Sequence, residues 1–135
     1  MERVAKGLRE LEPSIDVLAS SPFLRATQTA AIVSAAYDEL PVATVPVFMP
    51  DGSLEAGLDW LNRQPARATV AVVGHEPHLS TFATWLLTGL NESRMELRKG
   101  GVCVIEFTGR LREGEGQLQW LLPPGVLRAL SRGEK

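Results

Sequence analysis

Arginine, histidine and serine side chains, which proteins often use to bind phosphoryl groups, occur in two short segments of this 135-residue chain. Residues 20–30 read Ser-Ser-Pro-Phe-Leu-Arg-Ala-Thr-Gln-Thr-Ala, and residues 74–77 read Gly-His-Glu-Pro. Each segment follows an apolar run typical of a buried strand and precedes a run with helical period. Backbone N–H groups converge where a helix begins, so both segments predict a pocket for an anion.

Four side chains in these segments are candidate site residues. Arg25 falls in the first turn of a predicted helix, where a guanidinium offers a bidentate fork to a phosphoryl group. The alternative is a solvated arginine with Ser21 as the helix cap. His75 directly follows a strand, at the carboxyl end where open α/β sheets bind ligands; otherwise it bonds to backbone at the helix start. Glu76 either orients His75 or stabilises the helix N-terminus through the dipole.

The histidine spacing argues against a metal site. His75 and His78 are three residues apart with Pro77 between them, which is not the spacing of a helical zinc pair. We therefore predict no metal ion and interpret His78 as a surface residue. The chain also has no phosphate-binding Walker loop and no dinucleotide glycine fingerprint, so the enzyme classes that use these motifs get no support.

Strands and helices alternate in the predicted order of elements. Residues 42–48 contain Pro46, which cannot donate to a central ladder, so this strand is expected at a sheet edge. Residues 69–73 form a nearly continuous apolar run, typical of a central parallel strand covered on both faces. The periodicity predicts helices over residues 2–11, 24–37, 54–62 and 79–90, further strands over residues 15–20, 101–107 and 117–122, one helical turn over residues 126–130, and a frayed tail over residues 131–135.

This order predicts a three-layer α/β/α sandwich with a mostly parallel sheet that is closed by an antiparallel hairpin. The length fits a single domain over residues 1–135. Net charge is −2, which leaves no basic stripe for nucleic acid or for an acidic membrane surface. No apolar stretch approaches the roughly 20 residues of a membrane span. The single Cys103 excludes an intramolecular disulfide, and we expect a cytoplasmic location.

Together, the two motifs resemble the histidine phosphatase superfamily, which has a phosphoglycerate mutase-like fold. The small size points to its SixA-type phosphohistidine phosphatase branch, and the resemblance extends from Val4 to about Leu122. It implies that Arg25 and His75 are catalytic residues that clamp the phosphoryl oxygens. It also implies a phosphorylated protein or a small phosphorylated molecule as substrate, bound with the help of Ser21 and Glu76, and no metal or organic cofactor.

Larger members of the family carry an acidic proton donor between the edge strand and the Gly-His strand. Asp51 and Glu55 lie in that span of this chain. Turn formation accounts for Asp51, and no motif supports Glu55. SixA-type members act without a clear equivalent, so we assign no proton donor.

The resemblance also reveals an expected segment that the chain lacks. Members of the family begin with a strand ending in Arg-His-Gly, whose histidine attacks phosphorus, and neither His75 nor His78 matches that position. We therefore expect an N-terminally incomplete domain that is nearly inactive by itself. In the family this strand lies inside the sheet, so its absence leaves two half-sheets with unpaired edges that face each other.

Three functions remain open from the sequence. The first is phosphohistidine phosphatase-like hydrolysis through a phosphohistidine intermediate in the complete protein. The second is a non-catalytic module of the same fold that binds phosphate or a phosphoprotein. The third is assembly, in which the open sheet edge pairs with another chain, including a second copy in a homo-oligomer.

Overall fold

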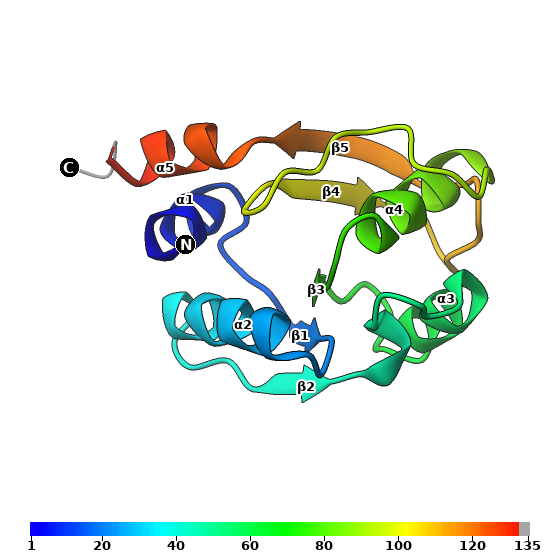
Figure 1. The fold of residues 1–135 in the computed structure, drawn as a ribbon, viewed down its shortest axis with the longest axis horizontal. Coiled ribbons are helices and arrows are strands. Elements are labelled where there is room, and N and C mark those ends of the chain that lie inside the picture. Colours follow the sequence, from blue (N-terminus) through cyan, green and yellow to red (C-terminus); the bar gives the residue numbers. More distant parts are fainter. Residues whose placement is uncertain (133–135) are drawn as a thin grey trace.

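The structure, a computed structural model, describes residues 1–132 (Figure 1). Its elements follow the predicted alternation of strands and helices, with a closing hairpin and a final helix. In chain order they are α1 (Glu2–Leu11), β1 (Val17–Ser20), α2 (Leu24–Ala36), β2 (Val42–Thr44), a 3₁₀ helix (Pro46–Phe48), α3 (Leu54–Asn62), β3 (Val70–Val73), α4 (His78–Thr88), β4 (Val102–Glu106), β5 (Gln117–Leu122) and α5 (Pro124–Arg132).

The strands form one layer between two layers of helices. In β1, Leu18 packs with α1 and α2, whereas the next residue, Ala19, packs with α3 and α4. The same two apolar clusters include β4, since Val102 packs with the α1–α2 side and Ile105 with the α3–α4 side. Side chains of a strand alternate between its faces, so β1 and β4 lie in one layer. The predicted three-layer α/β fold is confirmed.

The strand layer consists of two separate sheets. The first is parallel, with strand order β2-β1-β3, and the second is the antiparallel pair β4-β5. Within residues 1–132, β3 pairs only with β1, and β4 only with β5. Figure 1 shows β3 and β4 as the nearest strands of the two sheets. Each sheet therefore has an unpaired edge on the side of the other sheet.

The position of β3 corrects one expectation from the sequence. Its apolar run predicted a central strand covered on both faces, but β3 lies at the edge of its sheet and all four of its residues are only half-buried. No strand of the described chain lies on its far side. Apolar composition alone therefore indicated a more complete burial than the structure provides.

The segment after β2 differs from the predicted strand over residues 42–48. Strand β2 lies at the sheet edge, as predicted, but it ends at Thr44. Pro46 then occupies the first position of a 3₁₀ helix, where its fixed φ and missing N–H are well tolerated. This turn buries Phe48 completely in the core beside α3 and α4.

The last helix is longer than the single predicted turn. Helix α5 includes Ser131 and Arg132, which the sequence had placed in a frayed tail; residues 133–135 lie outside the described part of the chain. Leu127 is fully buried, and Gly7 of α1 lets the two helices approach closely. A Cβ atom on Gly7 would lie 1.8 Å from the Leu127 carbonyl oxygen. Helix α5 is therefore longer than the single predicted turn and packs closely against α1 through Leu127.

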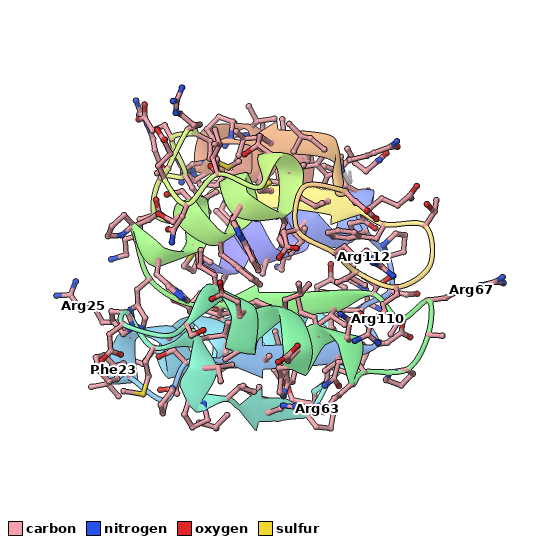
Figure 2. The ribbon with its side chains drawn as sticks, turned by 90° about the vertical axis from the view of Figure 1, so that its right-hand side faces the viewer. Phe23, Arg25, Arg63, Arg67, Arg110 and Arg112 are labelled. Carbon is pink, nitrogen blue, oxygen red and sulfur yellow. The ribbon has the colours of Figure 1, made fainter. Side chains whose placement is uncertain are left out.

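The loop between β4 and β5 is attached to the end of α3. The Asn62 side-chain amide donates to the Leu111 carbonyl and accepts from the Leu111 N–H, both at 2.9 Å. Four arginines gather near this junction, at the opposite side of the molecule from Phe23 and Arg25 (Figure 2). They are Arg63, Arg67, Arg110 and Arg112.

Within residues 1–132, no helix is long and apolar enough to cross a membrane.

Candidate functional site

Two loops meet at the carboxyl end of the parallel sheet. Strands β1 and β3 are neighbours, with Ser20 opposite Val73. The Ser21 N–H donates to the Val73 carbonyl at 2.9 Å, so the residues that follow both strands lie side by side. This register brings the two sequence motifs together at the edge where open α/β sheets bind ligands.

A hydrogen bond between Ser21 and His75 forms the centre of the candidate site. Ser21 is fully buried, and its Oγ lies 2.8 Å from Nε2 of His75. The same Oγ accepts the Phe23 N–H at 3.2 Å, which holds the hydroxyl in place. Helix α2 begins after Phe23 without a side-chain cap, so Ser21 does not cap it. Ser21 instead fixes the imidazole of His75.

Phe23 supports the same imidazole from a second side. Its ring meets the His75 ring edge-on, with centroids 5.3 Å apart and planes inclined by 63°. Phe23 is 47% exposed, so one side of this aromatic pair faces solvent. The contact restricts the orientation of His75 while leaving the corner open to a ligand.

The surroundings of His75 favour its neutral form. Burial lowers the pKa of His75 below its ordinary value of 6.5, and the charge of His78 lowers it further. Desolvation and a nearby like charge both disfavour the imidazolium. At neutral pH, His75 is therefore a neutral ring with one N–H donor and one acceptor.

Arg25 lies at the same corner but does not complete a clamp in this structure. It is the second residue of α2, two residues after Phe23, and Figure 2 shows its side chain extending from the surface. Within the described chain, its guanidinium forms no hydrogen bond or ion pair. The structure thus brings Ser21, Phe23 and His75 together and leaves Arg25 beside them, exposed and unengaged.

Glu76 contacts the helix and not the imidazole. Its Oε1 accepts the Ser80 N–H at 2.7 Å, which satisfies a free donor in the first turn of α4. No hydrogen bond joins Glu76 to His75 in the described residues. Of the two roles considered from the sequence, the structure supports stabilisation of the α4 N-terminus.

The interpretation of His78 as a surface residue is wrong. Its side chain is only 8% exposed, and Nε2 lies 3.0 Å from the Gly52 carbonyl oxygen. The ring is also parallel to that of Phe82, at 6.4 Å between centroids. The turn before α3 covers the start of α4, a long-range contact that local periodicity does not reveal.

Neither of the two acidic residues considered as a proton donor contacts the Ser21–His75 pair. Asp51 is exposed in the turn before α3, and Glu55 bonds to the Ser53 hydroxyl at 3.2 Å. In the part of the chain that the structure describes, no three His, Cys, Asp or Glu side chains are grouped as metal ligands.

The sequence has a curated relative that establishes its family. An uncharacterized protein of Picosynechococcus sp. is 32% identical over 136 residues, which covers 89% of this chain and 79% of the relative. The chain belongs to the family of that protein. No family model matches the sequence.

Solved structures identify the fold. The protein histidine phosphatase SixA complexed with tungstate superposes with a TM-score of 0.76 at 22% identity, covering 93% of this chain and 80% of SixA. A putative phosphohistidine phosphatase SixA from Agrobacterium tumefaciens gives 0.70 at 17% identity, covering 91% and 77%. Phosphoglycerate mutase from Plasmodium falciparum gives 0.56 at 17% identity, covering 64% and 58%. The chain therefore has a histidine phosphatase-like fold.

Within this histidine phosphatase-like fold, sequence reasoning missed Phe23. Its role depends on contact with a ring 52 positions away in the sequence. One signal was present, because a large apolar residue stood in a polar turn directly before a helix. Such a residue is expected either to pack on a neighbouring loop or to contact a ligand.

Proposed function

We propose that this chain is the phosphate-binding part of a phosphohistidine phosphatase-like phosphoryl hydrolase. The observation that supports this most directly is the partly buried Ser21–His75 hydrogen bond beside the start of α2. It fixes a neutral imidazole at the carboxyl edge of a parallel sheet, one short loop from a helix N-terminus and an unpaired arginine. A phosphoryl group is the ligand that suits this combination.

In the proposed mechanism, each site residue has a separate task. The guanidinium of Arg25 turns inward and binds two phosphoryl oxygens. His75 donates an N–H to an oxygen and stabilises the negative charge that develops during transfer. Ser21 and Phe23 hold the ring of His75 in position, and Glu76 acts on substrate binding through the start of α4.

The nucleophile of this mechanism is a further histidine, on a strand between β3 and β4. Both strands have an unpaired edge there, and both apolar clusters include residues from β3 and from the β4–β5 hairpin. The added imidazole nitrogen attacks phosphorus while the bond to the leaving group breaks and that group takes up a proton. Water then attacks the phosphohistidine, releasing phosphate and restoring the imidazole.

A titration with inorganic phosphate tests the binding site in the 135-residue chain. We expect saturable binding that perturbs the amide signals of residues 21–25 and 74–76 in NMR spectra. Arg25→Ala should weaken binding by about tenfold or more, since it removes charge-assisted hydrogen bonds. Arg63→Ala removes an exposed arginine on the opposite side of the molecule and serves as the matched control. Equal losses in both variants would exclude the proposed pocket.

One observation favours a second function, a non-catalytic phosphate- or phosphoprotein-binding module. Both histidines of the chain are engaged, His75 with Ser21 and His78 with the Gly52 carbonyl, so neither stands free as a nucleophile. Hydrolysis of a phosphohistidine peptide separates the two functions. The hydrolase predicts activity once the codons upstream of Met1 are included and encode an apolar strand ending in Arg-His-Gly. Phosphate binding without hydrolysis in that longer polypeptide would support the binding module.

A further inference from the structure

Three consecutive apolar residues are exposed in the loop that carries the candidate site. They are Pro22, Phe23 and Leu24, and this apolar run begins directly after Ser21 and ends directly before Arg25. Phe23 is 47% exposed and Leu24 is 70% exposed, which are the two highest values among the large apolar side chains of the described chain. Such a run contributes little to the core and usually marks a contact with a ligand or a partner.

The start of α2 gives no local reason for a leucine. Leu24 is the first residue of this helix, which has no side-chain cap and no acidic residue in its first turn. Short polar and acidic residues are favoured at a helix start, because they bind its free N–H groups or interact with its dipole. Leu24 does neither, and its side chain faces solvent. Neither helix formation nor packing therefore explains its type.

The apolar run is in direct contact with the residues proposed to bind the phosphoryl group. The Phe23 N–H donates to the Ser21 hydroxyl at 3.2 Å, and the ring centroids of Phe23 and His75 are 5.3 Å apart. Leu24 is the sequence neighbour of Arg25, and Figure 2 shows Phe23 and Arg25 on the same side of the molecule. A phosphoryl group held between His75 and Arg25 therefore lies beside the apolar run.

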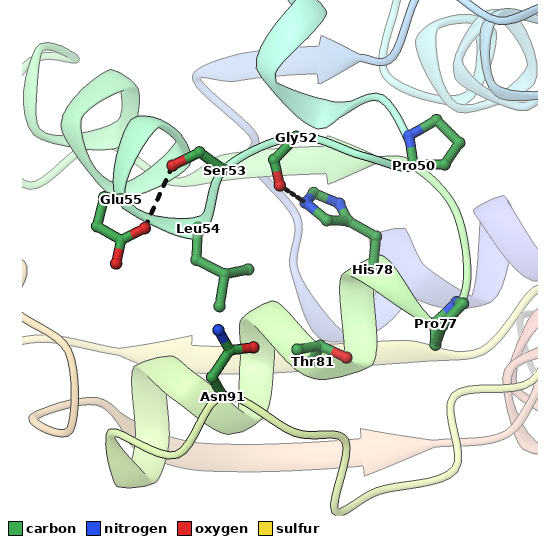
Figure 3. Close-up of a pocket in the computed structure, with 9 residues that line it drawn as sticks. All are labelled: Pro50, Gly52, Ser53, Leu54, Glu55, Pro77, His78, Thr81 and Asn91. Carbon is green, nitrogen blue, oxygen red and sulfur yellow. Dashed lines mark hydrogen bonds between the residues drawn. The ribbon is translucent and has the colours of Figure 1, made fainter.

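The residues that follow His75 present a different surface. Glu76 and Pro77 are exposed, and Glu76 carries a carboxylate. His78 is buried, with Nε2 at 3.0 Å from the Gly52 carbonyl oxygen, in the wall of a pocket of about 340 Å³ (Figure 3). No residue of the phosphoryl corner lines that pocket. The large exposed apolar side chains of the corner are thus the ones that follow β1.

The order of the strands indicates which part of the substrate meets the apolar run. Phe23 follows β1, His75 follows the neighbouring strand β3, and the nucleophile of the proposed function lies on a strand beyond β3. Phe23 and the nucleophile are therefore on opposite sides of the His75 loop. In phosphoryl transfer, the attacking and leaving groups lie roughly in line on opposite sides of phosphorus. The leaving group thus departs on the side of the apolar run.

We propose that Phe23 and Leu24 form an apolar contact surface for the leaving group of the substrate. This inference rests on the proposed function, since the position of the nucleophile sets the direction of the leaving group. The surface selects ligands in which an apolar or aromatic group lies next to the phosphoryl group, and it disfavours hydrophilic ones such as sugar phosphates. Phe23 then has two tasks, because one side of its ring supports His75 and the exposed side contacts the substrate.

Three ligands, titrated into the 135-residue chain and followed by NMR, test this surface. Methylphosphonate carries the PO₃ group on a single carbon, benzylphosphonate adds an aromatic ring, and glycerol 3-phosphate is similar in size to benzylphosphonate but hydrophilic. At a pH at which all three are dianions, benzylphosphonate should bind about tenfold more tightly than either of the others, which corresponds to removing about 60 Å² of apolar surface from water. Equal affinities for benzylphosphonate and glycerol 3-phosphate would overturn the proposal.

Substitutions separate the contact surface from the support of His75. Leu24→Ala should reduce the tenfold preference for benzylphosphonate over methylphosphonate to about threefold, because it removes part of the surface and no contact of His75. Leu118→Ala, at an exposed leucine on β5, is the matched control and should keep the preference. Phe23→Ala should lower the preference and also weaken the binding of both ligands. Weaker binding at an unchanged preference would show that Phe23 only supports His75, and would refute its contact with the substrate.

The same titrations distinguish this inference from the proposed function. If methylphosphonate perturbs the amide signals of residues 21–25 and benzylphosphonate binds no more tightly, the phosphate-binding function stands and the apolar contact surface is refuted. If neither phosphonate binds, both proposals are refuted.

Discussion

The residue with the most constrained chemistry is His75. Its ring is held by the Ser21 hydroxyl at 2.8 Å and by the edge of Phe23, so it has little freedom to rotate. A fixed, neutral imidazole donates one hydrogen bond without first losing its hydration shell. Preorganised donors of this kind are the groups that stabilise developing charge most effectively.

The lowered pKa of His75 gives a prediction for both stability and binding. The unfolded chain binds more protons at this residue than the folded chain, so its stabilising contribution is present above about pH 6.5 and is lost as pH falls through the folded pKa. Bound phosphate should raise the pKa again by favouring the imidazolium. Titration of the His75 ring signals by NMR, with and without phosphate, measures both effects. A pKa at or above 6.5 in the free chain would contradict the structure.

At the scale of elements, the contact between α1 and α5 depends on one glycine. Helix propensity alone predicts that Gly7→Ala stabilises α1 by about 1 kcal/mol. The structure predicts the opposite sign, because the added Cβ would meet the Leu127 carbonyl at 1.8 Å and force the helices apart. We expect a loss of about 1–3 kcal/mol in the free energy of unfolding, measured by urea denaturation.

Lys6→Ala is the control for this substitution, since Lys6 is the exposed neighbour of Gly7 on the same helix. It should change the free energy of unfolding by no more than about 0.5 kcal/mol. A stabilising effect of Gly7→Ala would show that α1 and α5 do not pack as described.

The sequence predicted the elements that have strong local signals and missed those that depend on distant contacts. Helix α3 has its predicted bounds, and Gly89 ends α4 with a φ of 81°, as a C-terminal glycine should. By contrast, the packing of Leu127 on α1 and the burial of His78 under the turn around Gly52 had no signal in the local sequence. Both contacts join segments far apart in sequence, which periodicity does not detect.

The same distinction holds for the candidate site: the positions of its residues were predictable from the sequence, and their side-chain partners were not. Position after a strand was enough to predict that Ser21 and His75 lie at one edge of the sheet, because parallel neighbours end together. The partner of each side chain was not predictable, since Ser21 also fits a helix cap and Glu76 also fits a ligand to the ring. Three-dimensional geometry was needed to assign Ser21 to His75 and Glu76 to Ser80.

At the scale of the whole molecule, the divided strand layer predicts an uneven pattern of amide exchange. Strands β3 and β4 each pair along one edge, so alternate N–H groups in them have no ladder partner in the described chain. We expect neighbouring amides of residues 70–73 and 102–106 to alternate between slow and fast hydrogen exchange, followed by NMR. Slow exchange at every position would contradict an open edge. In that case, sedimentation would show whether a second copy of the chain covers the unpaired edges of β3 and β4.

The reciprocal bonds between Asn62 and Leu111 join α3 to the β4–β5 loop, and within residues 1–132 no strand pairing connects the two sheets. They connect the end of α3, beside the parallel sheet, to the tip of the antiparallel hairpin. Such a tether limits how far the two sheets can move apart. If a further strand docks between β3 and β4, as the proposed function requires, it meets two edges at a defined spacing, and the conformational entropy of that strand is the principal cost of docking.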